Sequence, residues 1–502
     1  MDNPRDVING SIIAVVFSFC NHRLGGKLVL FLIFAIAYFI ILLLMGIFAQ
    51  RRTSKSPDDY FLAGRSFGSI ILFFSLVATN FSAFTFLGFA GKAYSSGFGQ
   101  YGIMAFGTGF MAIMFYVIGR KVWKLGKNKG YITPAELVGG RFKSKRLQLL
   151  FMSILVLFTI PYLATQAIGA GLLLEYVTNG VLLWKIGAVI TISIIMLYVL
   201  FGGMRGSGWT DVLQGCIMIV ALVLAVFWIA NGLGGVQQAN LLSFQQNPDL
   251  FARPGPTGFF TPQIWFSFML LWLLADPMFP QIFSRFYTAK DQRSLKVAMI
   301  LYPLVVSFLF LIPVLIGVWA HGAQIPIADH EIDMVLPMMV QTFAPSAVFF
   351  FVMIGALAAL MSTADSQLLS LSTMLARDIP FKKWKKLSQV DIGRVFVIVL
   401  SLFAIFFVIA GYDPSVGIMS TLVSSTFSGL AVLFPVVIAV LYWSKATELG
   451  CIFALLAGEG IVFVFQHFSI SPFGFLPALW GVSIATVVLV LVSIVKHSSM
   501  SN

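Results

Sequence analysis

ALAALMSTADSQLLSLSTMLARD, residues 356–378, decides how the rest of the chain is interpreted. It ends an apolar run that begins at Ala347 and is long enough to cross a bilayer, yet its second half is rich in hydroxyl groups. Four residues share one helical face, with Asp365 at its edge: Ala359, Ser362, Thr363 and Ser366. Carboxylates and hydroxyls at membrane depth cost free energy unless they face protein, water or an ion. Such oxygens suit a small hard cation, although Ser and Thr also bond to carbonyls of their own helix and pack helices together.

The composition is that of a protein that crosses the membrane many times. Of its 502 residues, 59% are hydrophobic and only 10% are charged, which is too apolar for a soluble protein and too long for a single anchor. The apolar runs are helical, which excludes a barrel, because barrel strands alternate at period two. Cys20, Cys216 and Cys451 lack the spacing of a disulfide framework or a metal cluster.

Thirteen apolar segments predict an all-α membrane protein with about 13 transmembrane helices. They cover residues 27–49, 69–94, 101–119, 147–176, 181–201, 210–233, 262–285, 295–320, 343–375, 392–411, 414–441, 448–468 and 473–495. Residues 1–26 precede them and are interpreted as a short interfacial or poorly ordered extension. The residues that open it are acidic where a secretory signal would be basic, and no cleavage site follows.

Basic residues are concentrated in alternate loops. The loops on one side, together with the C-terminus, hold 26 of the 32 Lys and Arg residues, and the other side holds the remaining 6. Because cytoplasmic loops carry the excess of Lys and Arg, the N-terminus is expected outside and the C-terminus in the cytoplasm. The net charge of +13 is therefore explained by topology and does not indicate a nucleic-acid partner.

Two apolar segments contain features that break helices. SLVATNFSAFTFLGFAGKAY (75–94) places polar side chains at mid-membrane depth, and LLADPMFPQIFSRF (273–286) contains Pro277 and Pro280, which free carbonyl groups. Polar groups and freed backbone at that depth are tolerated only beside a cavity or inside protein. The segments run in opposite directions, five apart, which predicts an inverted repeat of five plus five helices with the solute and ion sites between the breaks. Two ordinary kinked helices are the simpler alternative.

Three motifs resemble those of the sodium/solute symporter family, which includes bacterial transporters of proline, pantothenate, sialic acid and galactose. They are DDYFLAGRS (58–66), LFGGMRGSGWTDVLQG (200–215) and MSTADSQLLSLSTMLARDI (361–379), and the resemblance extends from Lys27 to Lys496. It implies the leucine-transporter fold. The implied parts are an extra N-terminal helix at 27–49, a ten-helix inverted-repeat transport core at 50–447, and two C-terminal helices with a tail at 448–502.

The resemblance also implies a site for a co-transported sodium ion, between the first and eighth helices of the core. Its ligands would be the backbone carbonyls of Ala78, Phe81 and Ala359 and the side-chain oxygens of Ser362 and Thr363. Five oxygens around a small cation agree with hard-ion chemistry.

Some family members bind a second sodium ion with the aspartate of the WTD motif, which is Asp211 here. Asp365 and Ser366, one turn below the first site, complete this second candidate site. Family members usually carry a hydroxyl where this chain has Asp365, so the extra carboxylate either strengthens the site or takes up a proton. Asp211 also begins a helical segment, where a carboxylate interacts favourably with the positive helix end whether or not an ion binds.

Candidate solute-binding residues lie at the two breaks: Asn80, Ser82, Thr85, Asp276, Phe279 and Gln281. Proline-transporting members carry an aspartate at the position of Asn80 and galactose transporters carry asparagine, which weakens a proline assignment without establishing a sugar. Asp276 either contacts solute or caps the proline break. Arg285 matches the family pattern and is expected at the cytoplasmic end of its segment in a structural role.

The predicted function is sodium-coupled symport of a small organic solute across the plasma membrane, the inner membrane of a prokaryote. Proton coupling on the same scaffold and a transporter-like solute sensor or channel are the alternatives. The sequence has no HExxH, GxSxG or P-loop motif, so enzyme activity is not expected. The expected partners are the solute and the lipid bilayer, with no obligate protein partner. Pantothenate, a monocarboxylate, an amino acid and a sugar all remain open as solutes.

Overall fold

The structure is a computed structural model that describes residues 4–54, 56–380, 387–411 and 426–501. Across these ranges the chain folds into helices, and one isolated bridge joins Phe67 to Ala289. The α-helices are α1 (Pro4–Arg52), α2 (Pro57–Leu62), α3 (Ser69–Asn80), α4 (Phe89–Ser96), α5 (Gly99–Lys129), α6 (Pro134–Phe142), α7 (Lys145–Val177), α8 (Trp184–Gly232), α9 (Val236–Gln246), α10 (Pro262–Ala275), α11 (Pro280–Thr288), α12 (Gln292–Gly322), α13 (Val335–Phe343), α14 (Ser346–Asp378), α15 (Gln389–Gly411), α17 (Ser428–Tyr442), α18 (Glu448–His467) and α19 (Pro477–Ser501).

The helices have the lengths expected of a multi-pass membrane protein. Within the described ranges, nine are long and apolar enough to cross a membrane, or up to eleven if each of two bent pairs is one span. This number is lower than the predicted thirteen for two reasons. α8 covers two predicted segments in 49 residues, and α17 is short because much of the predicted segment 414–441 lies outside the described residues.

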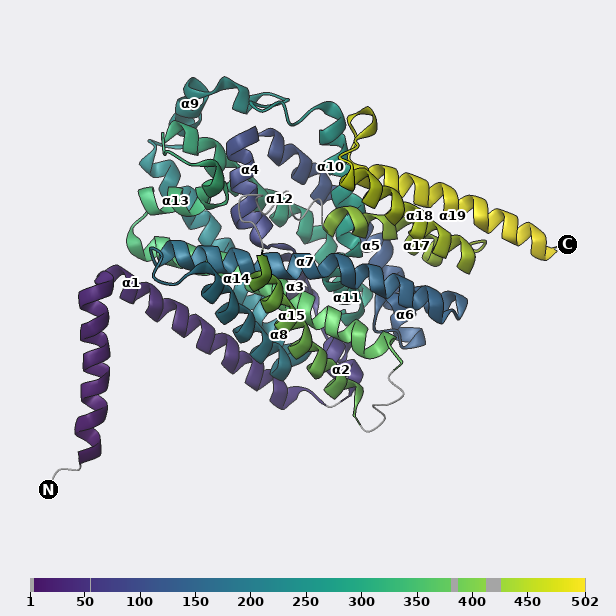
Figure 1. The fold of residues 1–502 in the computed structure, drawn as a ribbon, viewed down its shortest axis with the longest axis horizontal. Coiled ribbons are helices and arrows are strands. Elements are labelled where there is room, and N and C mark those ends of the chain that lie inside the picture. Colours follow the sequence, from purple (N-terminus) through teal and green to yellow (C-terminus); the bar gives the residue numbers. More distant parts are fainter. Residues whose placement is uncertain (1–3, 55, 381–386, 412–425, 502) are drawn as a thin grey trace.

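The bundle has a buried centre and a peripheral layer. In α14 the apolar part is 83% buried, compared with 28% for the spans Leu28–Arg52 and Pro477–His497 at the two ends of the chain. α14 packs against α7 and α8, α1 packs on α8, and α18 pairs with α19 beside α17. Figure 1 shows α2 and α6 at one end of the bundle and α9 and α13 at the other. α1 joins the described part of the predicted extension, residues 4–26, and the first predicted span in one helix.

α8 changes direction at Gly203, in the glycine-rich motif that the sequence places at a corner between two spans. Gly203 has a φ of 51° and a ψ of −149°, a conformation that residues with a side chain avoid. A Cβ atom there would also lie 2.7 Å from the carbonyl oxygen of Tyr60 in α2. The Tyr60 hydroxyl donates to the carbonyl of Val199 at 3.2 Å, so α2 is fixed against this kink.

Both predicted helix breaks are confirmed. α3 gives way to an extended residue, Phe81 (φ −79°, ψ 117°), and a π-helical turn at Phe84–Gly88 then leads into α4. The two halves bend by 62°. In the second pair, a 3-10 turn at Asp276–Met278 separates α10 from α11, with a bend of 53°. α11 begins at Pro280, where the missing N–H would have no helical partner in any case.

Candidate ion and solute sites

Hydroxyl groups of α14 contact the backbone of α3 at its break. The Ser362 hydroxyl lies 2.8 Å from the carbonyl oxygen of Ala78 and 3.1 Å from that of Ala359. The Thr363 hydroxyl donates to the carbonyl oxygen of Phe81 at 2.7 Å. All five residues are fully buried. The structure therefore gathers the residues of the first candidate sodium site where α3 meets α14.

The break in α3 explains why these carbonyls accept bonds from another helix. The last carbonyls of a helix lack partners within it, and Phe81 is extended where the helical pattern would have continued. A hydroxyl oxygen that donates its proton to a carbonyl keeps its lone pairs. The same carbonyl and hydroxyl oxygens can therefore hold the helices together and coordinate a cation.

Arg285 is the centre of a second buried cluster. Its Nη2, which carries two hydrogens, lies within hydrogen-bond distance of the Asp211 carboxylate at 2.9 Å, the Ser207 hydroxyl at 2.9 Å and the Ser366 hydroxyl at 2.5 Å. The side chains of Arg285 and Asp211 are both 0% exposed. The sequence predicted only a structural arginine near the cytoplasmic end. In the structure the guanidinium is buried against two of the three candidate ligands of the second sodium ion, Asp211 and Ser366.

Asp365 completes this cluster and is surrounded by hydroxyl groups. Its carboxylate accepts from Tyr198 at 2.9 Å, from Ser207 at 3.0 Å and from Ser366 at 2.9 Å. Ser207 and Ser366 also accept from the Arg285 guanidinium, so Asp365 and Asp211 belong to one network. The three candidate residues from α8 and α14 are thus brought together, with an arginine among them.

The charges of the cluster do not balance when both carboxylates are ionised. Within the described part of the chain it contains one guanidinium, Arg285, and two carboxylates, Asp211 and Asp365. A buried charge without a partner is costly. One sodium ion or one proton would make the cluster neutral.

Asn80 connects the two helix breaks. Its amide nitrogen donates to the Asp276 carboxylate at 3.2 Å and to the Tyr302 hydroxyl at 2.6 Å. Both Asn80 and Asp276 are buried. Beside them, the Tyr162 hydroxyl lies 3.2 Å from the hydroxyl of Ser82. Polar groups from the end of α3 and the break after it, from the 3-10 turn after α10, and from α7 and α12 therefore meet in the interior.

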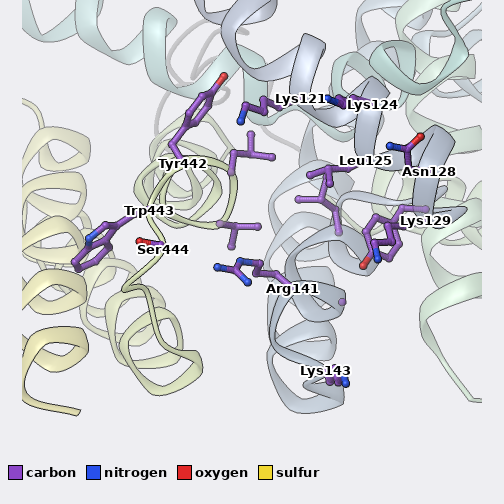
Figure 2. A pocket seen from close by; sticks show the side chains of 15 residues that line it. Lys121, Lys124, Leu125, Asn128, Lys129, Arg141, Lys143, Tyr442, Trp443 and Ser444 are labelled. Carbon is purple, nitrogen blue, oxygen red and sulfur yellow. The ribbon is translucent and has the colours of Figure 1, made fainter. Parts of the chain in front are cut away.

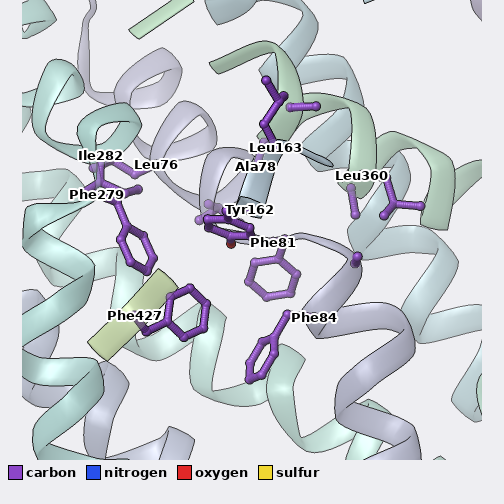
Figure 3. Packing of buried hydrophobic residues seen from close by; sticks show 14 of the residues in the cluster. Leu76, Ala78, Phe81, Phe84, Tyr162, Leu163, Phe279, Ile282, Leu360 and Phe427 are labelled. Carbon is purple, nitrogen blue, oxygen red and sulfur yellow. The ribbon is translucent and has the colours of Figure 1, made fainter. Parts of the chain in front are cut away.

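Aromatic rings surround these polar groups. The ring centroid of Phe279 lies 5.7 Å from that of Tyr162 and 5.1 Å from that of Phe427. Trp272 lies 5.2 Å from Phe427 and 5.2 Å from Phe84. Figure 3 shows Phe84, Tyr162, Phe279 and Phe427 grouped together. A solute at this place would meet apolar walls and a few polar groups, as is usual for small-molecule sites.

Two predicted solute residues make fewer contacts. Thr85 accepts the N–H of Ser82 at 3.5 Å, the limit for a hydrogen bond. Gln281 is fully buried, and its amide oxygen and nitrogen have no hydrogen-bond partner among the residues that the structure describes. Leaving buried polar atoms unpaired costs about 1–3 kcal/mol. Gln281 is therefore a group that a bound ligand would stabilise.

Sequence reasoning did not identify Tyr162, Tyr198, Tyr302 or Ser207 as part of these sites. The three tyrosines lie in apolar helices, where each is indistinguishable from a residue that only packs, and Ser207 lies in the motif at 200–215 without a spacing that marks it as a ligand. The one available signal was the cost of an ionisable group within an apolar run, and it applied to Arg285.

A model of the sodium:solute symporter family matches residues 60–458. The chain belongs to this family. It is accordingly a multi-pass membrane protein and a sodium-coupled solute symporter, in a family of transporters and not of enzymes, and sodium is its co-substrate.

Relatives align over most of their length. The chain is 28% identical to the sodium/pantothenate symporter of Escherichia coli (strain K12), over 88% of this chain and 92% of that protein. It is 29% identical to the uncharacterized symporter YhjB of Bacillus subtilis (strain 168), over 86% and 88% of the two chains. It is 26% identical to the high-affinity proline transporter PutP of the same organism, over 86% and 91%.

Solved structures confirm the predicted leucine-transporter fold. A Na⁺-coupled sialic acid symporter in a substrate-bound outward-open state aligns with a TM-score of 0.76 at 20% identity, covering 94% of this chain and 98% of that one. MHP1, a nucleobase-cation-symport-1 family transporter, aligns with a TM-score of 0.59 at 14% identity, covering 88% and 94%. MhsT in complex with L-phenylalanine aligns with a TM-score of 0.51 at 14% identity, covering 85% and 98%.

Proposed function

We propose that this symporter carries a small organic solute into the cell with sodium, and that the first sodium ion binds between α3 and α14. Its ligands are the carbonyl oxygens of Ala78, Phe81 and Ala359 and the hydroxyl oxygens of Ser362 and Thr363. The observation that carries the proposal is the contact of the two hydroxyls with carbonyls at the break of α3. Because these oxygens belong to two helices, a bound ion holds the helices together.

Sodium and solute are coupled through the break of α3, which contributes to both sites. Asn80, a solute residue, is the direct neighbour of Phe81, a sodium ligand. The coupling is reciprocal, so solute raises the affinity for sodium by the factor by which sodium raises the affinity for solute. An inward sodium ion supplies about 2.3 kcal/mol per 100 mV of membrane potential, in addition to its concentration gradient. Rocking of the broken helices against the rest of the bundle then alternates access.

The second site takes one further monovalent cation at Asp365 and Ser366. Arg285 pairs with Asp211 and so neutralises one of the two carboxylates. The charge that remains is that of Asp365, whose surrounding hydroxyls are suitable ligands for sodium. Asp211 joins this site only when the guanidinium moves away. A proton on Asp365 is the alternative that the same charge balance allows.

The solute is one that donates hydrogen bonds through amine or hydroxyl groups. The Asp276 carboxylate can only accept hydrogen bonds when ionised, and the surrounding rings provide apolar walls. Relatives are named for pantothenate and proline. Pantothenate carries hydroxyls and an amide and proline carries an amine, whereas a simple monocarboxylate has no such donor.

The membrane orientation follows from charge. The side that holds 26 of the 32 basic residues is placed in the cytoplasm, which puts the C-terminus, α2 and α6 there. The membrane is the plasma membrane, where an inward sodium gradient is available.

A thermal-shift screen tests the proposal. Purified protein is heated with pantothenate, proline, a hexose or pyruvate, in sodium chloride or in potassium chloride of equal concentration. A ligand that binds only the folded state stabilises it by RT ln(1 + L/Kd), where L is the free ligand concentration, and so raises Tm. We expect one solute to raise Tm in sodium and to have a much smaller effect in potassium. Equal stabilisation in both salts would remove the support for sodium coupling.

A further inference from the structure

A cavity of about 670 Å³ lies where α5, α6 and the end of α17 meet, away from the sites described above (Figure 2). Five of the side chains that line it are cationic: Lys121, Lys124, Lys129, Arg141 and Lys143. No described carboxylate lines it. In Figure 2 the side chains of Lys121 and Arg141 extend toward the part of the cavity wall that contains Tyr442 and Ser444.

These five charges are not neutralised within the described part of the chain. None of them takes part in an ion pair there. The acidic residue of α6, Glu136, is paired with Arg377 at 2.8 Å. Like charges around one cavity raise the positive potential inside it and attract an anion.

The other walls of the cavity are apolar. Leu125 and Leu137 contribute from α5 and α6, and Val440 and Leu441 contribute from α17. A small dissolved anion would gain nothing from these walls. A molecule with an anionic head and hydrocarbon chains would use both kinds of surface.

The cavity also lies at the depth of lipid headgroups. α5 ends at Lys129 and α17 ends at Tyr442, so the spans on both sides of it stop here. Tyr442 and Trp443 line it, and Tyr and Trp concentrate where membrane meets water. The Lys121 ammonium lies 4.7 Å from the centroid of the Tyr442 ring, and the Tyr442 hydroxyl donates to the carbonyl of Val117 at 2.6 Å.

We propose that this cavity binds an anionic phospholipid, with the headgroup phosphate among the lysine and arginine side chains and the acyl chains along the apolar wall. Basic pockets between spans suit such headgroups. A neighbouring hollow of about 330 Å³ shares Lys121, Lys124 and Tyr442 and adds Arg120, so the cationic surface continues along α5. The bound lipid contacts α5, α6 and α17 together and fixes their separation at this end of the bundle.

Two matched triple variants test the proposal. Lys124→Gln, Arg141→Gln and Lys143→Gln remove three charges from the cavity, and all three side chains are exposed, so the fold should tolerate the changes. Lys290→Gln, Arg293→Gln and Lys296→Gln remove three exposed charges that line none of the cavities described here. Both proteins carry the same net charge.

The measurement is the lipid retained by the intact protein in native mass spectrometry. Wild type and both variants are reconstituted in phosphatidylcholine with about 20% phosphatidylglycerol. We expect wild type and the control variant to retain phosphatidylglycerol over phosphatidylcholine by more than about fivefold relative to the membrane, and the cavity variant to lose this preference. An unchanged preference in the cavity variant, or an equal loss in the control, would overturn the proposal. Displacement of the lipid by inorganic phosphate alone would show a site for soluble anions instead.

Discussion

Ser362 and Thr363 matter most among single residues, because their hydroxyls reach the backbone of another helix. Changing both to Ala removes two of the five proposed sodium ligands. The sodium concentration for half-maximal uptake should rise by more than about tenfold, while the apparent affinity for solute in saturating sodium changes much less. Uptake measured as a function of sodium concentration gives both values.

The same helix offers a matched control. The hydroxyls of Ser372 and Thr373 are also buried, and both donate only to the carbonyl of Leu369 in their own helix. Replacing this pair by Ala removes the same chemical groups without touching α3, so sodium dependence should not change. Equal shifts for both pairs would mean that Ser362 and Thr363 serve packing alone.

Asp365 is a carboxylate at a position where the resemblance to the family implies a hydroxyl. Asp365→Asn keeps the volume and removes the charge that the proposed second cation balances, so the sodium Hill coefficient should fall from about 2 to about 1. Asp378→Asn is the control, because Asp378 lies in the same helix but accepts from Thr133 and Gln148, outside the cluster. The cluster takes a proton if two results are found together. The Asp365→Asn protein keeps the sodium cooperativity of the wild type, and its uptake no longer depends on pH where that of the wild type does.

The sequence placed Ser362 and Thr363 on one helical face but did not predict that Arg285 contacts Asp211, and the difference has a physical cause. Ser362 and Thr363 follow Ala359 at helical spacing, so local geometry places them on one face. The meeting of Arg285 with Asp211 depends on the packing of α11 against other helices across 74 positions of sequence. No spacing rule within one segment reports such a contact.

Among the helices, α8 depends most on one residue. Gly203→Ala places a side chain at a φ of 51° and a Cβ atom 2.7 Å from the carbonyl of Tyr60. The substitution should lower the free energy of unfolding by about 1–3 kcal/mol, seen as a lower Tm. Gly109→Ala is the control, because Gly109 lies within α5 and a Cβ atom there meets nothing within 4 Å. A Tm lowered equally by both substitutions would contradict this account of the kink.

The helix breaks were predictable from composition, and so was the change of direction inside α8. Proline removes a hydrogen-bond donor wherever it occurs, so Pro277 and Pro280 predict a break from sequence alone. The glycine-rich motif at 200–215 looks like a corner by composition. In the structure two helical parts meet at the non-helical residue Gly203, and α1 and α2 both pack against α8.

At the scale of the molecule, the charge asymmetry predicts the orientation. In a background without native cysteines, Gln238→Cys in α9 and Asn128→Cys at the end of α5 place exposed thiols at opposite ends of the bundle. A membrane-impermeant maleimide should label Gln238→Cys in intact cells and Asn128→Cys only after permeabilisation. The opposite pattern would reverse the orientation and the proposed direction of transport.

The general architecture could be predicted because helix length and apolar content reflect the thickness of the bilayer. The solute could not, because its recognition depends on groups such as Asn80, Asp276 and Tyr302, which meet only after folding. Their identities were visible in the sequence, but the distances between them were not.

The central claim, sodium-driven uptake of solute, is tested most directly in proteoliposomes. The solute that stabilises the protein in the thermal-shift screen is supplied outside vesicles that contain potassium, with sodium outside. The account predicts accumulation above the external concentration, which is lost when external sodium is replaced by potassium and is strongly reduced at the same sodium concentration in the Ser362→Ala, Thr363→Ala protein. Accumulation driven by a proton gradient without sodium, or equilibration of the solute without accumulation, would contradict it.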